Sequence, residues 1–375
     1  TYYTLNTSYN SKINSRLFVK AGVIAELMNL NLFYRNRRYT TFWNNIWDFN
    51  DYTELYQAYV HTKYNINSKL TLNLGLHSQF LALNNALSVE PRAGVKYQLG
   101  PKSSISAGYG LHSQIQPIDV YFYRSLNSDG TYNQSNNQLG FTKSHHVVLG
   151  YDILPFKDWR VKTEVYYQYL FDVPVTTTPG SFSMLNQGAS FNPNEQGNLV
   201  NKGNGSNYGL ELTIEKFFSR GYYGLVTGSV YESKYKGSDG IERNTAFNGN
   251  FVYNILIGKE IKLGKEKRNS LTMDVKCTQA GGRYYTPVDL EASQAVKQQV
   301  LKGDAYAFTL RNPDFFRLDM KAGFTINSKT RKLSQSLFFD IQNVTNHKNV
   351  FAQRYNPVTN KINTAYQIGL FPNFI

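Results

Sequence analysis

Residues 34–52 carry the densest group of side chains that could bind a ligand. The segment reads YRNRRYTTFWNNIWDFNDY and holds two of the three tryptophans of the chain. Indole rings stack on planar groups, and guanidinium groups bind carboxylates or phosphates through paired hydrogen bonds. One interpretation of the segment is therefore a ligand-contacting lip on an outer loop, formed by Arg35, Arg37, Arg38, Trp43 and Trp47.

Two His-Ser pairs suggest a hydrolase, but their spacing argues against one. They lie at 77–78 and 112–113 in extended runs, where adjacent residues point to opposite faces and cannot act as nucleophile and base. The pair His145 and His146 lacks the further convergent ligands that a metal site needs. The sequence also contains no phosphate loop, dinucleotide glycine motif or pair of catalytic carboxylates. We therefore expect no catalytic residue, no metal and no cofactor, and a protein that is not an enzyme.

The chain is built from extended runs in which apolar and polar residues alternate. In FFRLDMKAGFTI (315–326), apolar side chains occupy every second position from Phe316 to Ile326. Such a strand is apolar on one face and polar on the other, which suits a wall between lipid and water. The runs at 269–278 and 333–342 repeat the pattern. The polar files are predicted to line an aqueous lumen, through Asp274, Lys276, Arg317, Asp319, Lys321 and Asp340.

Two kinds of connection separate these runs and strictly alternate. One kind is short and basic, at 11–16, 65–69, 99–104, 154–160, 216–220, 258–268 and 327–332. The other is long, polar and rich in Asn, Gly and Tyr, at 34–52, 113–142, 172–205, 236–246, 281–314 and 345–364, with 83–89 as a brief member. The alternation predicts an antiparallel meander with all tight turns at one end and all long loops at the other.

Composition narrows the fold class further. The chain has 29 Tyr and 24 Phe in 375 residues, yet it lacks the run of ~20 apolar residues that a membrane helix needs. A soluble β-sandwich would also alternate, but the runs here exceed the ~5–6 residues usual in soluble sheets. The single cysteine, Cys277, lies in an apolar file and is interpreted as a small hydrophobic residue. We predict an all-β fold, a transmembrane antiparallel β-barrel with about 15 strands in this chain.

The net charge of +14 is concentrated on the short turns, which hold 16 Lys or Arg residues and 3 acids. A basic rim of this kind suits anionic lipid headgroups, and solvated turn residues explain it equally well. Because the charge follows a rim and forms no single stripe, we expect no nucleic-acid partner. Residues 34–52 then have a second interpretation, which the sequence favours: an aromatic band at the membrane interface whose arginines meet lipopolysaccharide phosphates.

The last part of the chain carries motifs of a known family. The run FFDIQNVTNHKNVF (338–351), the Tyr-Asn-Pro at 355–357 and YQIGLFPNF (366–374) resemble the end of Bacteroidetes-type TonB-dependent outer-membrane receptors. The runs GGRYYTPVDLEAS (281–293) and NPDFFRLDMKAGF (312–324) are similar to the preceding loop and strand of that family. Upstream, the likeness is architectural: strands, short turns and long loops.

The resemblance implies a barrel of about 22 strands with an N-terminal plug, in the cell outer membrane of a Gram-negative bacterium. It implies uptake of a scarce nutrient, an iron chelate, cobalamin, glycan or peptide, driven by a TonB complex that pulls on the plug. Expected partners are outer-membrane lipid, lipopolysaccharide, the TonB complex and a surface lipoprotein. We expect residues 1–375 to form one partial barrel, with the plug and the first strands outside this chain and the last strand cut short.

Two alternatives remain open at this point. One is a passive diffusion porin, and the other is a structural or adhesive barrel that partners a surface lipoprotein. A plug-like domain preceding Thr1 in the precursor would favour the receptor, whereas its absence together with single-channel conductance would favour the porin.

Overall fold

The fold is one antiparallel sheet whose strands pair in chain order. The computed structural model describes residues 1–37, 42–187, 194–330, 332–367 and 369–374. Fifteen strands follow one another in a sixteen-stranded sheet, and the sixteenth, β13 (Glu242–Asn244), pairs only with β12. The strands of the path are β1 (Tyr2–Lys12), β2 (Leu17–Asn36), β3 (Asn44–Asn65), β4 (Leu70–Leu81), β5 (Ala86–Gly100), β6 (Ser103–Gln114), β9 (Thr142–Ile153), β10 (Trp159–Thr176), β11 (Leu199–Ser219), β12 (Tyr222–Lys236), β14 (Phe251–Leu263), β15 (Asn269–Ala280), β18 (Phe315–Asn327), β19 (Ser334–Gln342) and β22 (Phe371–Phe374).

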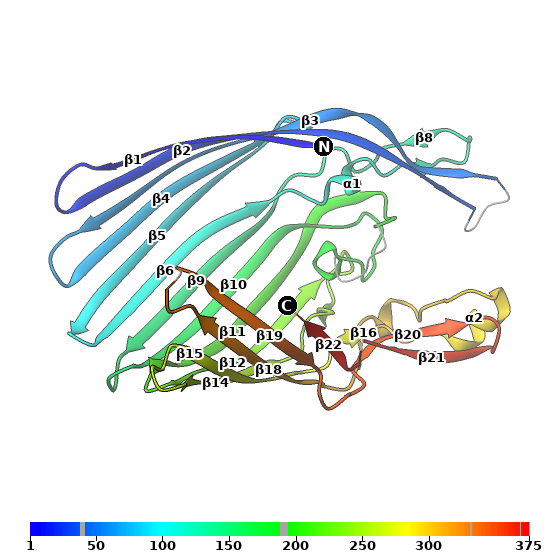
Figure 1. Cartoon of the computed structure of the whole chain (residues 1–375). Helices are drawn as coiled ribbons and strands as arrows, with labels where there is room; N and C mark the ends of the chain where they lie inside the picture. The colour runs from blue at the N-terminus through cyan, green and yellow to red at the C-terminus, as the bar shows by residue number, and fades with distance from the viewer. Residues whose placement is uncertain (38–41, 188–193, 331, 368, 375) are drawn as a thin grey trace.

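The sheet curves into a trough that is open between its two edge strands, β1 and β22 (Figure 1). The predicted all-β meander of about fifteen strands is confirmed. Within the part of the chain that the structure describes, the sheet does not close on itself, because β1 pairs only with β2 and β22 only with β19. No helix among the described residues combines the length and apolar character needed to cross a membrane.

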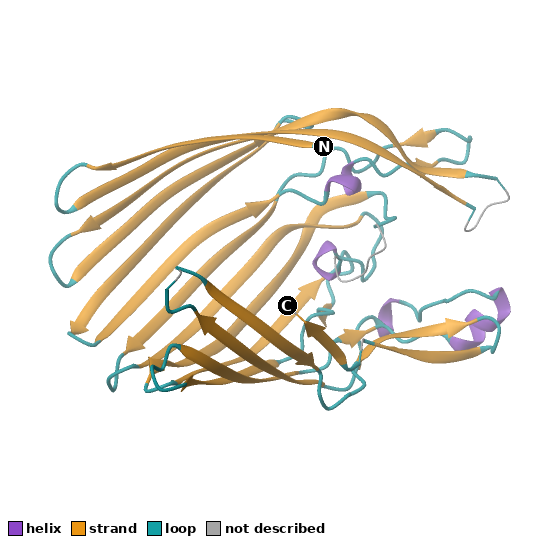
Figure 2. Cartoon of the chain, viewed as in Figure 1, coloured by secondary structure: helices purple, strands orange, loops and turns teal. Residues whose placement is uncertain are grey.

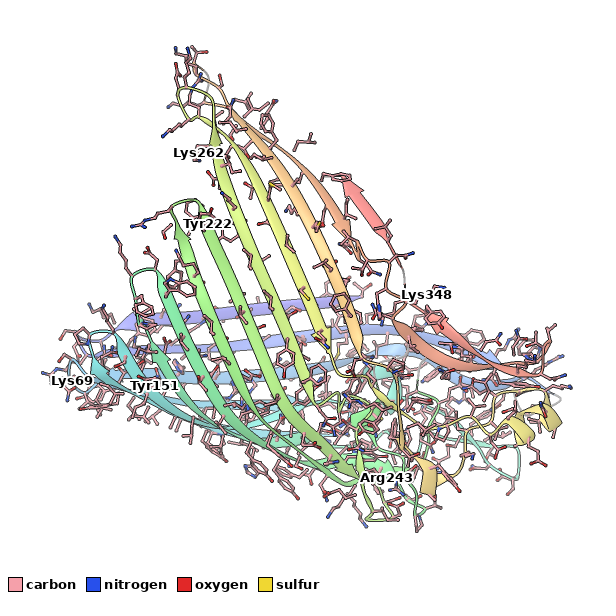
Figure 3. The ribbon with its side chains drawn as sticks, turned by 90° about the horizontal axis from the view of Figure 1, so that it is seen from below. Lys69, Tyr151, Tyr222, Arg243, Lys262 and Lys348 are labelled. Atoms are coloured by element: carbon pink, nitrogen blue, oxygen red, sulfur yellow. The ribbon has the colours of Figure 1, made fainter. Side chains whose placement is uncertain are left out.

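The tight turns lie at one end of the trough and the long connections at the other (Figure 2). Lys69 and Lys262 lie at the turn end, and Arg243 and Lys348 belong to the loop end (Figure 3). The long connections carry the remaining elements: α1 (Ile118–Tyr121), β7 (Ser125–Leu126), β8 (Tyr132–Asn133), η1 (Met184–Asn186), β16 (Tyr284–Tyr285), α2 (Leu290–Val296), η2 (Asp304–Tyr306), β17 (Leu310–Arg311), β20 (Val350–Asn356) and β21 (Lys361–Tyr366).

Asparagine side chains close two of the tight turns in the same way. Asn14 Oδ1 accepts hydrogen bonds from the backbone N–H groups of Arg16, at 2.8 Å, and Leu17, at 2.9 Å. Asn67 Oδ1 does the same for Lys69 and Leu70, at 2.8 and 2.9 Å. An Asn side chain that bonds backbone two residues on mimics a turn, which explains the repeated Asn-Ser at these positions.

The strand register collects the apolar residues on one face, here called the apolar face. Directly opposed partners connect one row of it from β2 to β14, through Leu17, Tyr64, Leu72, Val95, Ala107, Leu149, Val165, Leu210, Val230 and Phe251. These side chains lack a covering layer: Leu149 is 57% exposed and Val165 is 52% exposed. A continuous apolar surface of this extent marks a membrane or partner contact.

The opposite face, here called the polar face, carries a matching polar row from β5 to β18. Its members are Gln98, Ser104, Asp152, Lys162, Thr213, Thr227, Asn254, Thr278 and Arg317. Asn254 bridges two strands, since its amide nitrogen donates to Thr227 Oγ1 at 3.3 Å and its carbonyl oxygen accepts from Thr278 Oγ1 at 3.0 Å. The apolar files therefore do not pack against each other in a sealed interior.

Two of the expected long loops are much shorter than the sequence indicated. Residues 34–52 were expected to form a loop, but the β2–β3 ladder continues to the pair Asn36 and Asn44, so the connection is only 37–43. The β10–β11 ladder likewise continues to Thr176 and Leu199, which leaves 177–198 as the connection between those strands. The expected strands were too short because the outer parts of these strands lack an apolar face. A two-stranded ribbon that projects beyond the wall does not need one.

A pair of adjacent substitutions tests the assignment of the two faces. Leu149→Arg places a charge on the apolar face and should cost ~2–4 kcal/mol of folding free energy in a bilayer if that face meets lipid. Val148→Arg places the same charge one residue away on the polar face and should cost much less, because the charge there does not enter lipid. Urea unfolding in liposomes measures both, and equal costs would contradict the assignment.

Candidate functional site: the loop layer and the polar face

The hydrophobic core of the molecule lies beneath a loop at the loop end of the polar face. The polar file of β4 changes character there, since Gln79 is followed on the same face by Leu81, which is fully buried. Met28 of β2 and Leu55 of β3 are buried in the same cluster, 2% and 5% exposed. The connection 115–141 covers them with Val120, Tyr121, Phe122, Leu139 and Phe141. This loop therefore folds onto the inside of the wall instead of projecting away from it.

Asn136 holds this loop to the neighbouring connection 177–198. Its side chain is fully buried, and its amide nitrogen donates to Val120 O at 3.1 Å and to Gln196 O at 2.8 Å. Its Oδ1 accepts from Leu199 N at 3.1 Å. Buried amides are stable only when they are paired. Asn136 therefore couples α1, the 177–198 connection and the start of β11.

Trp47 belongs to this core and is not a free binding surface. It is 3% exposed, and its indole N–H donates to Asp119 O at 2.7 Å. Its ring contacts Tyr34 and Tyr123, with centroids 5.6 and 6.2 Å apart. Burial also raises the pKa of the neighbouring Tyr121 phenol to about 12, so this ring stays neutral at physiological pH.

The exposed candidates gather at the tip of the β2–β3 ribbon. Trp43 is 48% exposed, and the guanidinium carbons of Arg35 and Arg37 lie 4.8 and 4.7 Å from its ring centre. Two cations on one indole form a compact site that could bind an anionic or planar group. Asn36 Nδ2 donates to Glu195 Oε2 at 3.1 Å, which ties the tip to the connection 177–198. Arg38, the fifth predicted residue, lies outside the described residues.

A group of polar side chains, here called the clasp, joins three long connections. It consists of Ser181, Tyr235, Asp239, Arg243 and Asp304. Arg243 donates to both carboxylate oxygens of Asp239, at 2.9 and 2.6 Å, and to Asp304 O at 3.2 Å. Asp304 accepts from Ser181 Oγ, and Tyr235 donates to Ser181 O at 2.9 Å. The Arg243 and Asp239 side chains are only 7% and 15% exposed. The hydrogen bonds from Arg243 lower the pKa of Asp239.

The six residues predicted to line a lumen share the polar face. In direct register, Asp274 opposes Lys321, Lys321 opposes Asp340, and Lys276 opposes Asp319. Arg317 donates to Asp319 Oδ2 at 3.0 Å. Asp319 is 9% exposed, and its Oδ1 accepts from Asn343 N at 2.9 Å, so it also closes the chain after β19. The lumen itself remains a prediction, since the sheet is open.

A buried carboxylate that the sequence reading missed lies on the polar face between β4 and β6. Glu90 is 1% exposed and accepts hydrogen bonds from Gln79 Nε2 at 2.6 Å, Arg92 at 2.7 Å and Ser113 Oγ. Its Oε2 lies 3.0 Å from His77 Nδ1. The only indication of Glu90 in the sequence was a charged residue at a polar position of the alternating strand pattern. Asn136 and Arg243 had no signal at all, because loops carry no periodicity.

His145 and His146 have different neighbours on the two faces of the sheet. His145 stacks on Phe171 with centroids 5.0 Å apart, whereas His146 is near Tyr166 at 6.2 Å. Their neighbours lie on opposite faces of the sheet, because Phe171 and Tyr166 differ in strand parity. No group of three His, Cys, Asp or Glu side chains that could hold a metal occurs in the described ranges.

Replacing Asn136 should loosen the loop layer without disturbing the wall. Asn136→Ala removes the hydrogen-bond partner of the Gln196 carbonyl and of the Leu199 N–H, and an unpaired buried polar group costs ~1–3 kcal/mol. We expect limited proteolysis to cut residues 115–141 at least about tenfold faster. Asn133→Ala on the exposed β8 is the matched control and should leave the cleavage rate unchanged.

The clasp should open at low pH. A carboxylate whose folded-state pKa is lowered stabilises the fold above its unfolded pKa of ~3.9, and this contribution is lost as pH falls through the folded pKa. Proteolysis by an acid-active protease should therefore accelerate in the connections 177–198 and 237–250 as pH drops below about 4. Asp239→Asn should make cleavage there fast at every pH. A pH profile that is the same in both proteins would contradict the clasp.

The chain matches a family model and a set of solved structures. The family described as "TonB dependent receptor-like, beta-barrel" matches residues 1–344. The ferric yersiniabactin uptake receptor FyuA from Yersinia pestis has 13% identity and a TM-score of 0.62, over 99% of this chain and 52% of that one. FpvA from P. aeruginosa, solved with pyoverdines, has 13% identity and a TM-score of 0.65, over 100% and 47%. The outer membrane transporter YddB from Escherichia coli has 12% identity and a TM-score of 0.64, over 100% and 53%.

These structures establish the fold, and this chain spans about half the length of each. A comparison with curated protein sequences gave no match. The family model, however, covers most of the chain, from the first strand through the end of β19. The wall with one apolar and one polar face, its tight turns at one end and its packed loops at the other are thus those of a known barrel, and the chain belongs to the TonB-dependent receptor family as part of its β-barrel domain.

Proposed function

We propose that this chain is the C-terminal part of the barrel of a TonB-dependent receptor that takes up a scarce nutrient across the outer membrane of a Gram-negative bacterium. The observation that carries the proposal is the division of the wall into an uncovered apolar face and a hydrogen-bonded polar face. The membership of the TonB-dependent receptor family supports it. The C-terminal motifs quoted above favour the Bacteroidetes type within that family.

The nutrient class is proposed from the charge of the loop layer. Arg35, Arg37 and Trp43 form an exposed cationic and aromatic site, which suits an anionic or planar ligand such as an iron chelate. Two of the structures with the same fold are a ferric yersiniabactin uptake receptor and a receptor bound to pyoverdines. Cobalamin, a glycan and a peptide remain the other classes in the proposal.

The proposed partners follow from the same placement. The TonB complex would act through a plug that precedes this chain in the full-length protein. Lipopolysaccharide would meet the loop end of the apolar face, where Lys236 opposes Asn204 on the same face as the exposed Leu210 and Val230. A surface lipoprotein would dock on the lobe built from α2, β20 and β21, where Val296 is 58% exposed and Val358 is 87% exposed.

Uptake measurements test the proposal directly. A strain that lacks the full-length protein should lose growth on one class of nutrient as the limiting source, and a plasmid copy should restore it. Uptake should stop when a protonophore collapses the proton gradient, because a TonB complex needs that gradient. The variant Arg35→Gln/Arg37→Gln should raise the half-saturating ligand concentration about tenfold, since two exposed charged contacts contribute about 0.7 kcal/mol each.

The outcomes separate the alternatives. Uptake that continues with the gradient collapsed, together with steady conductance in a planar bilayer, would indicate a diffusion porin. Normal uptake of all four nutrient classes without the protein, combined with co-purification of a lipoprotein, would indicate a structural or adhesive role.

A further inference from the structure

A groove opens on the apolar face at the turn end of the wall. It has a volume of about 740 Å³ and lies between the turn 154–158 and the turn that joins β11 to β12. Its floor follows one row of the register, in which Trp159 opposes Lys216, Lys216 opposes Gly224 and Gly224 opposes Ile257. Gly224 contributes no side chain, so the row has a gap between Lys216 and Ile257.

The two turns that frame the groove are fixed to each other. Phe217 N donates to Asp158 O at 2.8 Å across the two turns. Lys216 Nζ donates to Phe217 O at 2.7 Å and contacts Ser219 Oγ. Tyr222 and Lys259 oppose each other in register, and the Lys259 ammonium lies 4.7 Å from the Tyr222 ring centre. The groove is therefore present without a ligand to shape it.

The charges around the groove are strongly unbalanced. Lys157, Lys216 and Arg220 line it, and Asp158 is its one acid among the described lining residues. Lys157 and Arg220 are exposed, and neither forms an ion pair within the described ranges. Lys216 is the more informative cation, because it occupies a position of the apolar face directly after Leu212 and Ile214.

Aromatic side chains mark the depth of the groove relative to a bilayer. Trp159 is 38% exposed, Tyr222 is 48% exposed and Phe156 is 71% exposed. Aromatic rings gather where acyl chains give way to headgroups, and the stems of lysines lie along apolar surface with the ammonium at headgroup level. Ile257, in the same register row, is 61% exposed and continues the apolar face. The groove thus presents cations beside an apolar channel.

We propose that this groove is a binding site for an anionic glycerophospholipid. Lys157, Lys216 and Arg220 hold the headgroup phosphate, and one acyl chain lies along Gly224 and Ile257. The lipid comes from the leaflet at the turn end, because short turns of outer-membrane barrels face the periplasm. This inference rests on the proposed function, since it requires the wall to span the outer membrane. It is distinct from a diffuse basic rim, because a site needs the gap at Gly224 as well as charge.

Lipid association in nanodiscs tests the site. The full-length protein is reconstituted in phosphatidylcholine, and electron paramagnetic resonance measures the association of spin-labelled phosphatidylglycerol relative to spin-labelled phosphatidylcholine. The variant Lys216→Gln/Arg220→Gln should lower this relative association constant about 25-fold, because each of the two cations near the surface contributes roughly a fivefold preference for anionic lipid. Ile257→Trp fills the channel with all cations intact, and it should also release phosphatidylglycerol.

A matched control removes the same charge from turns without the groove. Lys12→Gln/Lys69→Gln should leave the relative association constant within about twofold of the unchanged protein, since the removed charges lie at the β1–β2 and β3–β4 turns. Equal losses in the two double variants would overturn the site in favour of a diffuse rim. Failure of the unchanged protein to insert, seen as absent heat-modifiable migration, would overturn the membrane placement and the site together. Insertion with no preference for phosphatidylglycerol would overturn the site alone.

Discussion

The structure depends on the rule that backbone N–H and C=O groups in hydrocarbon must be paired within the protein. A meander of long antiparallel strands meets this rule for every inner strand, since each has a hydrogen-bonded neighbour on both sides. Once the backbone is satisfied, the side chains are free to divide by face. The rows from Leu17 to Phe251 and from Gln98 to Arg317 show this division at its most regular. The same rule makes β1 and β22 the places where further strands would have to pair.

At the loop end a different constraint decides which face of the strands is apolar. The strands there extend beyond the part of the wall that needs an apolar outer face. The hydrophobic core lies on the polar face instead. Met28, Leu55 and Leu81 turn the inner wall apolar just where the connection 115–141 lands on it. Asn136 and the clasp then supply specific polar contacts between connections. The loop layer is therefore a small packed structure, and the ribbon tip with Arg35, Arg37 and Trp43 is its exposed margin.

The turn end is simpler and more strongly charged. Its cations occupy short turns closed by local hydrogen bonds, such as those of Asn14 and Asn67. Most of these cations are exposed. The groove between β10 and β14 differs because the register places a lysine, a glycine and an isoleucine side by side on the apolar face. A position where charges lie beside an apolar channel is suited to an amphipathic ligand.

The sequence by itself determined the meander, the two faces and the family, because a period of two residues and the alternation of turn and loop are local properties. It placed Asp274, Lys321 and Asp340 on one face, and the register confirms that they oppose one another. It left Trp47 between an outer lip and an aromatic band at the membrane interface, whereas the fold buries that ring against Asp119 and Tyr123. Only the tertiary structure decided the roles of Asn136, Arg243 and Glu90, since their partners lie on other connections or strands. It alone also decided that Gly224 opens a groove, because the gap left by a missing side chain has meaning only beside the strands that flank it.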